Sequence, residues 1–182
     1  MEEKLERDTR KFYRNPEGRR RWIVIPLVWI LGVIYFSAAA VYMYNWVGDK
    51  IFDRQKNLKF LRITAVKGRM LYDIKHFEVV GGQPVKLEFV NPDVMAHNLV
   101  IVKPNAIEAV GLAADRMLAD PEEVEIGQYI PKSDAVLFHT KMILPNSAET
   151  LRFNAPKDPG SYPYICTFPG HWRTMKGTMT VK

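Results

Sequence analysis

The stretch YPYICTFPGHWRTMKGTMTV, residues 162–181, predicts a β-strand, a tight loop and a second β-strand. Aromatic residues alternate before Cys166, which puts that cysteine on one face at the end of the first strand. The segment TFPG is a turn signal, and GTMTV resumes a strand. This arrangement brings the thiol of Cys166, the imidazole of His171 and the thioether of Met175 toward one point.

These three side chains are a soft ligand set, which favours copper. Two histidines and a cysteine in a trigonal plane, with a weak axial methionine, make an electron-transfer copper site. The candidate second histidine is His97 in VMAHNLVIV, because it follows a turn and begins an apolar strand. Taken singly, each residue has a structural alternative: Cys166 as a buried apolar side chain, His97 as a hydrogen-bonded strand residue and Met175 as a space filler.

Cys166 is the only cysteine among the 182 residues. It cannot form an internal disulfide, and the count excludes covalent haem attachment, an iron–sulfur cluster and a binuclear copper centre with two bridging thiolates. Two of the four histidines, His76 and His139, have no comparable setting, so we interpret them as ordinary structural or surface residues. They supply no convincing second metal site.

The sequence upstream of these residues is rich in strand patterns. LRITAV (61–66) and VKLEFV (85–90) alternate apolar and polar residues, as half-buried strands do. Turn clusters such as GGQP (81–84) and LPNS (144–147) have the spacing of an antiparallel sandwich. Residues 105–119 have helical composition and predict a flap between strands. The predicted fold class is therefore all-β, a β-sandwich preceded by a single transmembrane α-helix.

Residues 22–47 contain no charged side chain and exceed the about 20 residues that an α-helix needs to cross a membrane. Three arginines, 19–21, directly precede this segment, which predicts a cytoplasmic N-terminus and export of the rest of the chain to the periplasmic or extracellular side. The predicted domains are a cytoplasmic tail at 1–21, a transmembrane signal anchor at 22–47, a linker at 48–57 and a β-domain at 58–182.

Two alternatives concern the same N-terminal segment. SAAA at 37–40 resembles a cleavage site behind a basic region, as in a cleaved signal peptide. RRRWIVI also matches a twin-arginine signal loosely. Either signal exports the rest of the chain, as the membrane anchor does.

The net charge of +6 does not indicate binding to nucleic acid. It divides evenly, with nine Lys/Arg against six Asp/Glu in residues 1–50 and seventeen against fourteen in residues 51–182. Neither part has a basic stripe with interleaved aromatic residues. We therefore expect that nucleic acid is not a partner of this chain.

The segment CTFPGHWRTM, together with AHN upstream, resembles the azurin and auracyanin branch of the cupredoxins, which are single-copper electron carriers. The resemblance covers residues 58–182 and implies a cupredoxin-like Greek-key β-sandwich. It also implies one copper ion, with His97, Cys166 and His171 as strong equatorial ligands and Met175 as the weak axial ligand.

The same resemblance implies roles for three neighbouring residues. The carbonyl of Ala96 stands where azurins have a weak axial contact from a glycine, and the alanine leaves this contact open. Asn98 matches an asparagine that ties the two ligand loops together, with turn capping as the alternative. The backbone N–H of Phe168 matches a donor to the cysteine sulfur, and such bonds tune the redox potential.

The resemblance further implies that electrons pass through the edge of His171, inside an apolar patch to which Met95, Pro169 and Trp172 contribute. The implied function is a membrane-tethered blue copper protein that carries single electrons on the exported side of the cytoplasmic membrane. Its redox partners would be cytochromes or respiratory or photosynthetic membrane complexes. Alternatives are a fixed copper-containing subunit of such a complex and a copper-delivery protein. We expect no enzymatic activity, because a copper oxidase or nitrite reductase needs a second copper site.

Overall fold

The structure, a computed structural model, describes the backbone of residues 16–119 and 128–182, and the side chains from residue 29 onward within these ranges. The chain divides into two compact units, Met1–Lys50 and Ile51–Lys182. The first unit contains most of one long helix, and the second is a domain of strands. Of the predicted cytoplasmic tail, residues 1–15 lie outside the described residues, and residues 16–21 are helical.

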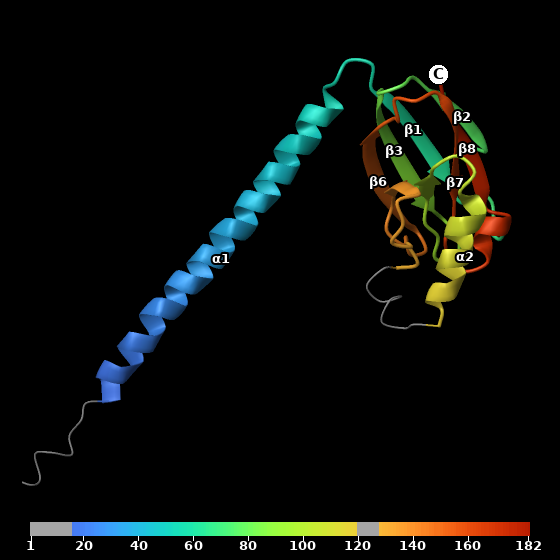
Figure 1. Cartoon of the computed structure of the whole chain (residues 1–182). Helices are drawn as coiled ribbons and strands as arrows, with labels where there is room; N and C mark the ends of the chain where they lie inside the picture. The colour runs from blue at the N-terminus through green and yellow to red at the C-terminus, as the bar shows by residue number, and fades with distance from the viewer. Residues whose placement is uncertain (1–15, 120–127) are drawn as a thin grey trace, which may run out of the picture. The chain divides into compact units, whose positions relative to one another are not determined.

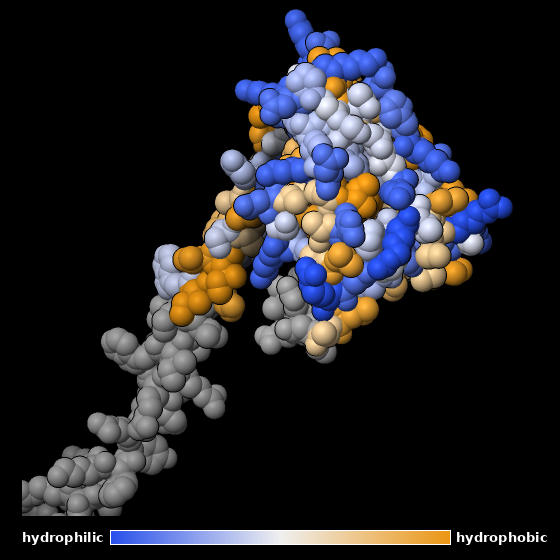
Figure 2. Space-filling model, turned by 45° about the vertical axis from the view of Figure 1, so that its right-hand side comes forward, coloured by the Kyte–Doolittle hydropathy of each residue, from blue (hydrophilic) through white to orange (hydrophobic). Residues whose placement is uncertain are grey.

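Helix α1 runs from Pro16 to Asp53, 38 residues, and is therefore about 57 Å long. Within its described part, Trp29–Asp53 is long and apolar enough to cross a membrane. Its aromatic side chains are exposed, with 72% of Trp29 and 74% of Phe36 open to the surroundings. Figure 2 shows apolar side chains along this part of α1. Such exposure in water is unfavourable, so the helix fits a membrane anchor or a signal sequence.

The predicted linker at 48–57 is helical over its first six residues, because α1 continues to Asp53. Gly48 is the weakest helix former in this stretch, but it does not end the helix. The carboxylate of Asp53 accepts a hydrogen bond from Lys86 Nζ at 2.6 Å and another from Arg152 Nε at 3.2 Å. These contacts tie the last helical residue to the strand domain.

Two sheets face each other in the domain (Figure 1). The smaller sheet has the strand order β1 (Lys59–Thr64), β3 (Pro84–Asn91), β6 (Ser147–Asn154). The larger sheet has the order β2 (His76–Val79), β8 (Lys176–Val181), β7 (Gly160–Ile165), β4 (Val100–Val102), β5 (Val136–His139). The expected all-β sandwich is therefore confirmed.

The turn spacing indicated an antiparallel sandwich, and four of the six strand pairs in the described residues are antiparallel, but two are parallel. Strand β1 pairs with β3 in parallel, and β2 pairs with β8 in parallel, while the other strand pairs are antiparallel. The cause is the crossover of β2 to the other sheet. Strand β2 lies between β1 and β3 in the sequence but belongs to the other sheet, so β1 and β3 are direct neighbours and run in the same direction.

The alternation of apolar residues predicted the core correctly. Leu61 and Ile63 in β1 are 8% and 0% exposed, and Val85, Leu87 and Phe89 in β3 are fully buried. Burying alternate residues of each strand is the main stabilising contribution to such a sandwich. The visible face of the domain is mostly hydrophilic, with small apolar patches (Figure 2).

Helix α2 (Ile107–Met117) confirms the helix expected over 105–119. It covers the outer face of β7, where Val110, Ile165 and Trp172 form a second apolar cluster beside the main core. The Trp172 ring packs so closely against α2 that residue 111 must be a glycine, because a Cβ on Gly111 would lie 2.2 Å from Cδ2 of Trp172. Strand β7 is thus buried on both faces, with Tyr164 on the inner side and Ile165 on the outer side.

A second glycine, Gly177, also lies against an aromatic ring, in the main core. Gly177 of β8 lies opposite Tyr164 of β7, and a Cβ on Gly177 would lie 2.2 Å from the tyrosine ring. We expect Gly177→Ala to lower the free energy of unfolding by about 1–3 kcal/mol, because the ring must leave its position. Guanidinium unfolding of the full chain in detergent, followed by near-ultraviolet circular dichroism, measures this.

Gly160→Ala, in the strand that pairs with β8, is the matched control. Its Cβ would meet Tyr162 at 3.6 Å, an ordinary contact. The control should change the free energy of unfolding by much less. Equal effects of the two substitutions would contradict the proposed clash with Tyr164.

Candidate metal centre

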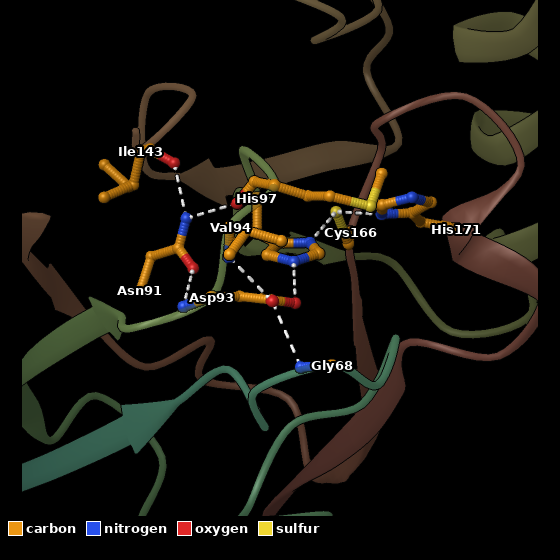
Figure 3. Close-up of polar contacts among 9 residues, drawn as sticks. Gly68, Asn91, Asp93, Val94, His97, Ile143, Cys166 and His171 are labelled. Carbon is orange, nitrogen blue, oxygen red and sulfur yellow. Dashed lines mark hydrogen bonds and ion pairs between the residues drawn. The ribbon is translucent and has the colours of Figure 1, made fainter. Parts of the chain in front are cut away.

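Three potential metal ligands converge at one end of the sandwich. His97 lies in the loop between β3 and β4, Cys166 directly follows β7, and His171 begins the short helix η3 (His171–Arg173). The sulfur of Cys166 is 3.8 Å from Nδ1 of His97 and 3.7 Å from Nδ1 of His171. The three ligand atoms all lie within 4.8 Å of one another. Figure 3 shows both rings turned toward the sulfur.

These distances fit one metal ion bound by all three atoms. With the bond lengths that thiolate and imidazole make to Zn²⁺, about 2.3 Å and about 2.0–2.1 Å, bond angles of about 120° place sulfur and nitrogen about 3.8 Å apart. The observed sulfur–nitrogen distances are 3.8 and 3.7 Å. A trigonal plane of one sulfur and two nitrogens suits copper. The residues present therefore fit the copper ion that the ligand set favours.

Met175 follows η3 and is fully buried. Its backbone N–H donates to the carbonyl of His171 at 2.8 Å, and its carbonyl accepts from the N–H of Cys166 at 3.0 Å. The backbone of Met175 is therefore hydrogen-bonded to both candidate ligands from the segment after β7, Cys166 and His171. These bonds hold its soft thioether at the same end of the domain as the three ligand atoms.

Asn98 joins the two ligand-bearing loops through its side chain. Its Nδ2 donates to Thr167 Oγ1 at 2.8 Å, and its Oδ1 accepts from the N–H of Thr167 at 2.8 Å. The backbone N–H groups of Asn98 and Phe168 are hydrogen-bonded to the Cys166 sulfur. The sulfur is thus held from both loops, and such bonds fix ligand geometry. Neither Asn98 nor Thr167 has exposed surface.

The profile of a family described as "Copper binding proteins, plastocyanin/azurin family" matches residues 61–182. This chain belongs to that family. Its members are blue copper proteins that transfer electrons, so the copper cofactor expected from the ligand set is confirmed. The matched residues run from Leu61, the third residue of β1, through β8 to the last residue, Lys182.

Individual relatives agree with this assignment. Auracyanin-A of Chloroflexus aurantiacus is 32% identical over 123 residues, which cover 66% of this chain and 73% of that protein. An azurin of Achromobacter denitrificans is 38% identical over 88 residues, covering 47% of this chain and 55% of the azurin. The crystal structure of dithionite-reduced auracyanin from the photosynthetic bacterium Roseiflexus castenholzii is 33% identical, has a TM-score of 0.59, and is covered over 97% of its length by 68% of this chain.

Sequence reasoning missed Asp93, which is hydrogen-bonded to a candidate ligand of this cupredoxin. Its Oδ2 lies 3.1 Å from Nε2 of His97, and only 4% of its side chain is exposed. Donation by the N–H of Gly68, followed by that of His97 and Val94, lowers the pKa of Asp93. The available signal was the NPD turn, which places a carboxylate four residues before the histidine.

Asp115 of α2 was also missed. Its carboxylate accepts hydrogen bonds from the N–H of Gly170 at 2.8 Å and from Nε1 of Trp172 at 3.1 Å, and it forms an ion pair with Arg173 at 2.9 Å. Burial raises its pKa, but these donors, Gly170 first, lower it overall. Three groups of the loop that carries His171 are therefore held by one side chain of α2.

The interactions of α2 correct one expectation about the surface. Trp172 is only 9% exposed and packs beneath α2, so it does not contribute an exposed ring to an apolar patch. Its ring occupies the space that a side chain at Gly111 would fill, and its Nε1 donates a hydrogen bond to Asp115. Met95 is 41% exposed and Pro169 is half-buried.

The other two histidines lie apart from the metal centre. His76 is exposed in β2 and pairs with Thr180 Oγ1 at 3.0 Å. His139 is exposed at the end of β5, with Nδ1 3.2 Å from the carbonyl of Thr140. Among the described residues, the cluster of potential metal ligands contains neither of them.

Burial shifts the pKa of two of the three candidate ligands, Cys166 and His171, in the metal-free site. It raises the pKa of the Cys166 thiol to about 11, against the opposing effect of the two N–H donors from Asn98 and Phe168. Burial, and next the neighbouring His97, lower the pKa of His171 to about 4. At neutral pH the thiol is therefore protonated and the His171 ring is neutral, ready to bind a metal without losing a proton.

We therefore predict that metal binding at pH 7 releases the Cys166 proton. Zn²⁺ is a suitable probe because it has no redox chemistry. The wild-type chain should release one more proton per bound Zn²⁺ than Cys166→Ser, measured by titration calorimetry in two buffers of different ionisation enthalpy. The affinity for Zn²⁺ should decrease as the pH is lowered from 8 to 5, because the thiol proton competes with the metal. It should decrease more steeply near pH 4, where His171 also becomes protonated. Equal proton release by both proteins would mean that Cys166 is not a ligand.

Proposed function

We propose that this cupredoxin is a membrane-tethered carrier of single electrons with one copper ion. His97, Cys166 and His171 would bind the ion in a plane, and Met175 would be the weak axial ligand. The observation that carries this proposal is the convergence of one sulfur and two nitrogens at 3.7 and 3.8 Å. Membership of a blue copper family supports it further.

Bound copper supplies a one-electron couple between Cu(I) and Cu(II). The chain contributes a rigid and dry setting for that couple. His97, Cys166 and Met175 have no exposed surface, and His171 has 4%. Asn98 and Phe168 hold the sulfur from two loops, so the ligand atoms keep their positions when the charge at the site changes.

The exposure of the two rings suggests where electrons enter and leave. His171 is 4% exposed whereas His97 is fully buried, which makes His171 the nearer of the two to solvent. Met95 and Pro169 would form an apolar contact surface around it, and Trp172 would support the loop from beneath. Small and weak interfaces suit a carrier that must leave its protein redox partner quickly. Cytochromes or membrane redox complexes are partners of this kind.

The helix α1 would anchor the carrier in the cytoplasmic membrane with its N-terminus in the cytoplasm. The arginines at 19–21 support this orientation by the positive-inside rule. The copper domain would then lie on the periplasmic or extracellular side. A tether raises the effective concentration of a carrier near membrane-bound partners without any additional contact.

The copper site has a direct spectroscopic test. The full chain, purified in detergent and loaded with Cu(II), should show an intense blue absorption band that ascorbate bleaches. Cys166→Ser should lose this band almost completely, because the band requires a thiolate bonded to copper. Visible absorption and the copper content of both proteins are the measurements.

His139→Ala is the matched control, since it removes a histidine outside the ligand cluster. It should keep the blue band at wild-type intensity. A wild-type chain that binds copper without any blue colour would overturn the proposed site and favour a copper-delivery role. Loss of the band in His139→Ala would also contradict the ligand assignment.

The membrane orientation is testable with single cysteines, because the native Cys166 is buried and should not react with a membrane-impermeant maleimide. Lys157→Cys lies on the exposed domain surface and should be labelled in intact cells. Thr9→Cys should be labelled only after lysis. Both chains should stay with the membrane after alkaline carbonate extraction. A labelled domain that washes off without its N-terminus would show that the helix is cleaved.

A further inference from the structure

The carboxylate of Asp93 lies behind His97, on the side of the ring away from Cys166. Nε2 of His97 is 3.1 Å from Asp93 Oδ2, while Nδ1 of the same ring is 3.8 Å from the Cys166 sulfur. Figure 3 shows the ring between the carboxylate and the sulfur. The His97 imidazole therefore contacts the Asp93 carboxylate through Nε2 and faces the candidate metal site through Nδ1.

The two oxygens of Asp93 have separate partners. Oδ1 accepts from the N–H of Val94 at 2.7 Å and from the N–H of Gly68 at 3.1 Å. Oδ2 faces His97. Gly68 lies in the turn after β1, whereas Asp93 and Val94 follow β3, so the two donors to Oδ1 come from different loops. Gly68 has φ +70°, a conformation that favours glycine. Because both N–H groups occupy Oδ1, the carboxylate cannot rotate freely and Oδ2 stays directed at the ring.

Asn91 holds the backbone that presents Asp93. Its Oδ1 accepts from the N–H of Asp93 at 3.1 Å, and its Nδ2 donates to the carbonyls of Met95 and Ile143 at 2.8 Å each. Ile143 in turn exchanges backbone hydrogen bonds with His97 at 2.7 and 3.1 Å. The carboxylate and the imidazole are thus positioned by one continuous network of buried and partly buried hydrogen bonds.

This network determines which nitrogen of His97 carries the proton. An ionised carboxylate is only an acceptor, so Nε2 of His97 must donate to it. In the neutral ring, Nδ1 then has a free lone pair, and that lone pair faces the Cys166 sulfur and the metal position. The geometry required of a metal ligand is present before any metal binds.

We propose that Asp93 is a positioning residue that fixes the tautomer of His97 and lowers the reduction potential of the copper ion. This inference rests on the proposed function of the site. A negative charge next to a ligand stabilises Cu(II) more than Cu(I), because Cu(II) has the larger positive charge. The hydrogen bond also makes the imidazole a stronger donor, which again favours Cu(II).

Asp93→Asn in the full, copper-loaded chain tests this effect. The amide has nearly the same shape, but its NH₂ group cannot accept a hydrogen bond. It therefore cannot satisfy Gly68, Val94 and His97 together. We expect the affinity for Cu(II) relative to Cu(I) to fall at least tenfold, which raises the reduction potential by about 59 mV or more for one electron. Spectroelectrochemical titration of the blue band measures this potential.

Asp73→Asn is the matched control. Asp73 is exposed, and its carboxylate accepts from the N–H groups of Thr64 and Ile74 at 2.7 Å each, without a histidine partner. It should keep the wild-type potential. Equal potentials in wild type and Asp93→Asn, with the blue band present in both, would overturn the role of Asp93. Absence of the blue band from the wild-type chain would instead overturn the proposed function.

The tautomer has a readout that needs no copper. In the metal-free wild-type chain, nitrogen-15 correlation spectra should show His97 protonated at Nε2, with slow exchange of that proton. Asp93→Asn should speed up the exchange by at least tenfold or mix the two tautomers. A wild-type ring protonated at Nδ1 would contradict the inference even if the variant failed to bind copper.

Discussion

The metal centre depends on the pair of hydrogen bonds between Asn98 and Thr167. These residues are 69 positions apart, and each follows a candidate ligand, His97 or Cys166, by one residue. Both bonds are 2.8 Å long and fully buried, where a lost partner leaves an unsatisfied group at a cost of about 1–3 kcal/mol. Because the amide offers one donor and one acceptor, the two loops meet in one register, and the imidazole and the sulfur are brought to a common point.

The same burial that excludes water also sets the charge of the site. Without a metal, burial favours a neutral thiol and a neutral His171 ring, so neither of these two side chains has an uncompensated charge in the core when the domain folds. A metal bound by Cys166 would replace the thiol proton, and its own positive charge would compensate the thiolate. Folding and metal binding therefore make compatible demands on one set of residues. The N–H groups of Asn98 and Phe168 assist, because they already oppose the effect of burial on the thiol.

The parts of the structure that follow local patterns could be predicted from sequence. Alternation identified β1 and β3, and the spacing from Cys166 to Met175 indicated the ligand loop, because both depend on neighbouring residues. The parallel pairing of β1 with β3 could not be predicted, since it depends on which sheet β2 joins. The inward position of Trp172 depends on an absent side chain, at Gly111 of α2. Such a packing relation has no periodic signal in the sequence.

Two aspartates near the site hold loops in place, but their charges have different consequences. Asp115 forms an ion pair with Arg173, so its charge is compensated at the side of the loop. Asp93 accepts from N–H groups of Gly68, Val94 and His97, so its charge lies directly against the imidazole. If the Cys166 thiolate and the two neutral imidazoles bound Cu(II), the site would have a formal charge of +1, and the Asp93 carboxylate would bring the sum to zero. A neutral assembly is the least costly one to bury, so a Cu(II) ion bound here would add to the stabilisation that these N–H groups give to Asp93, which is 4% exposed.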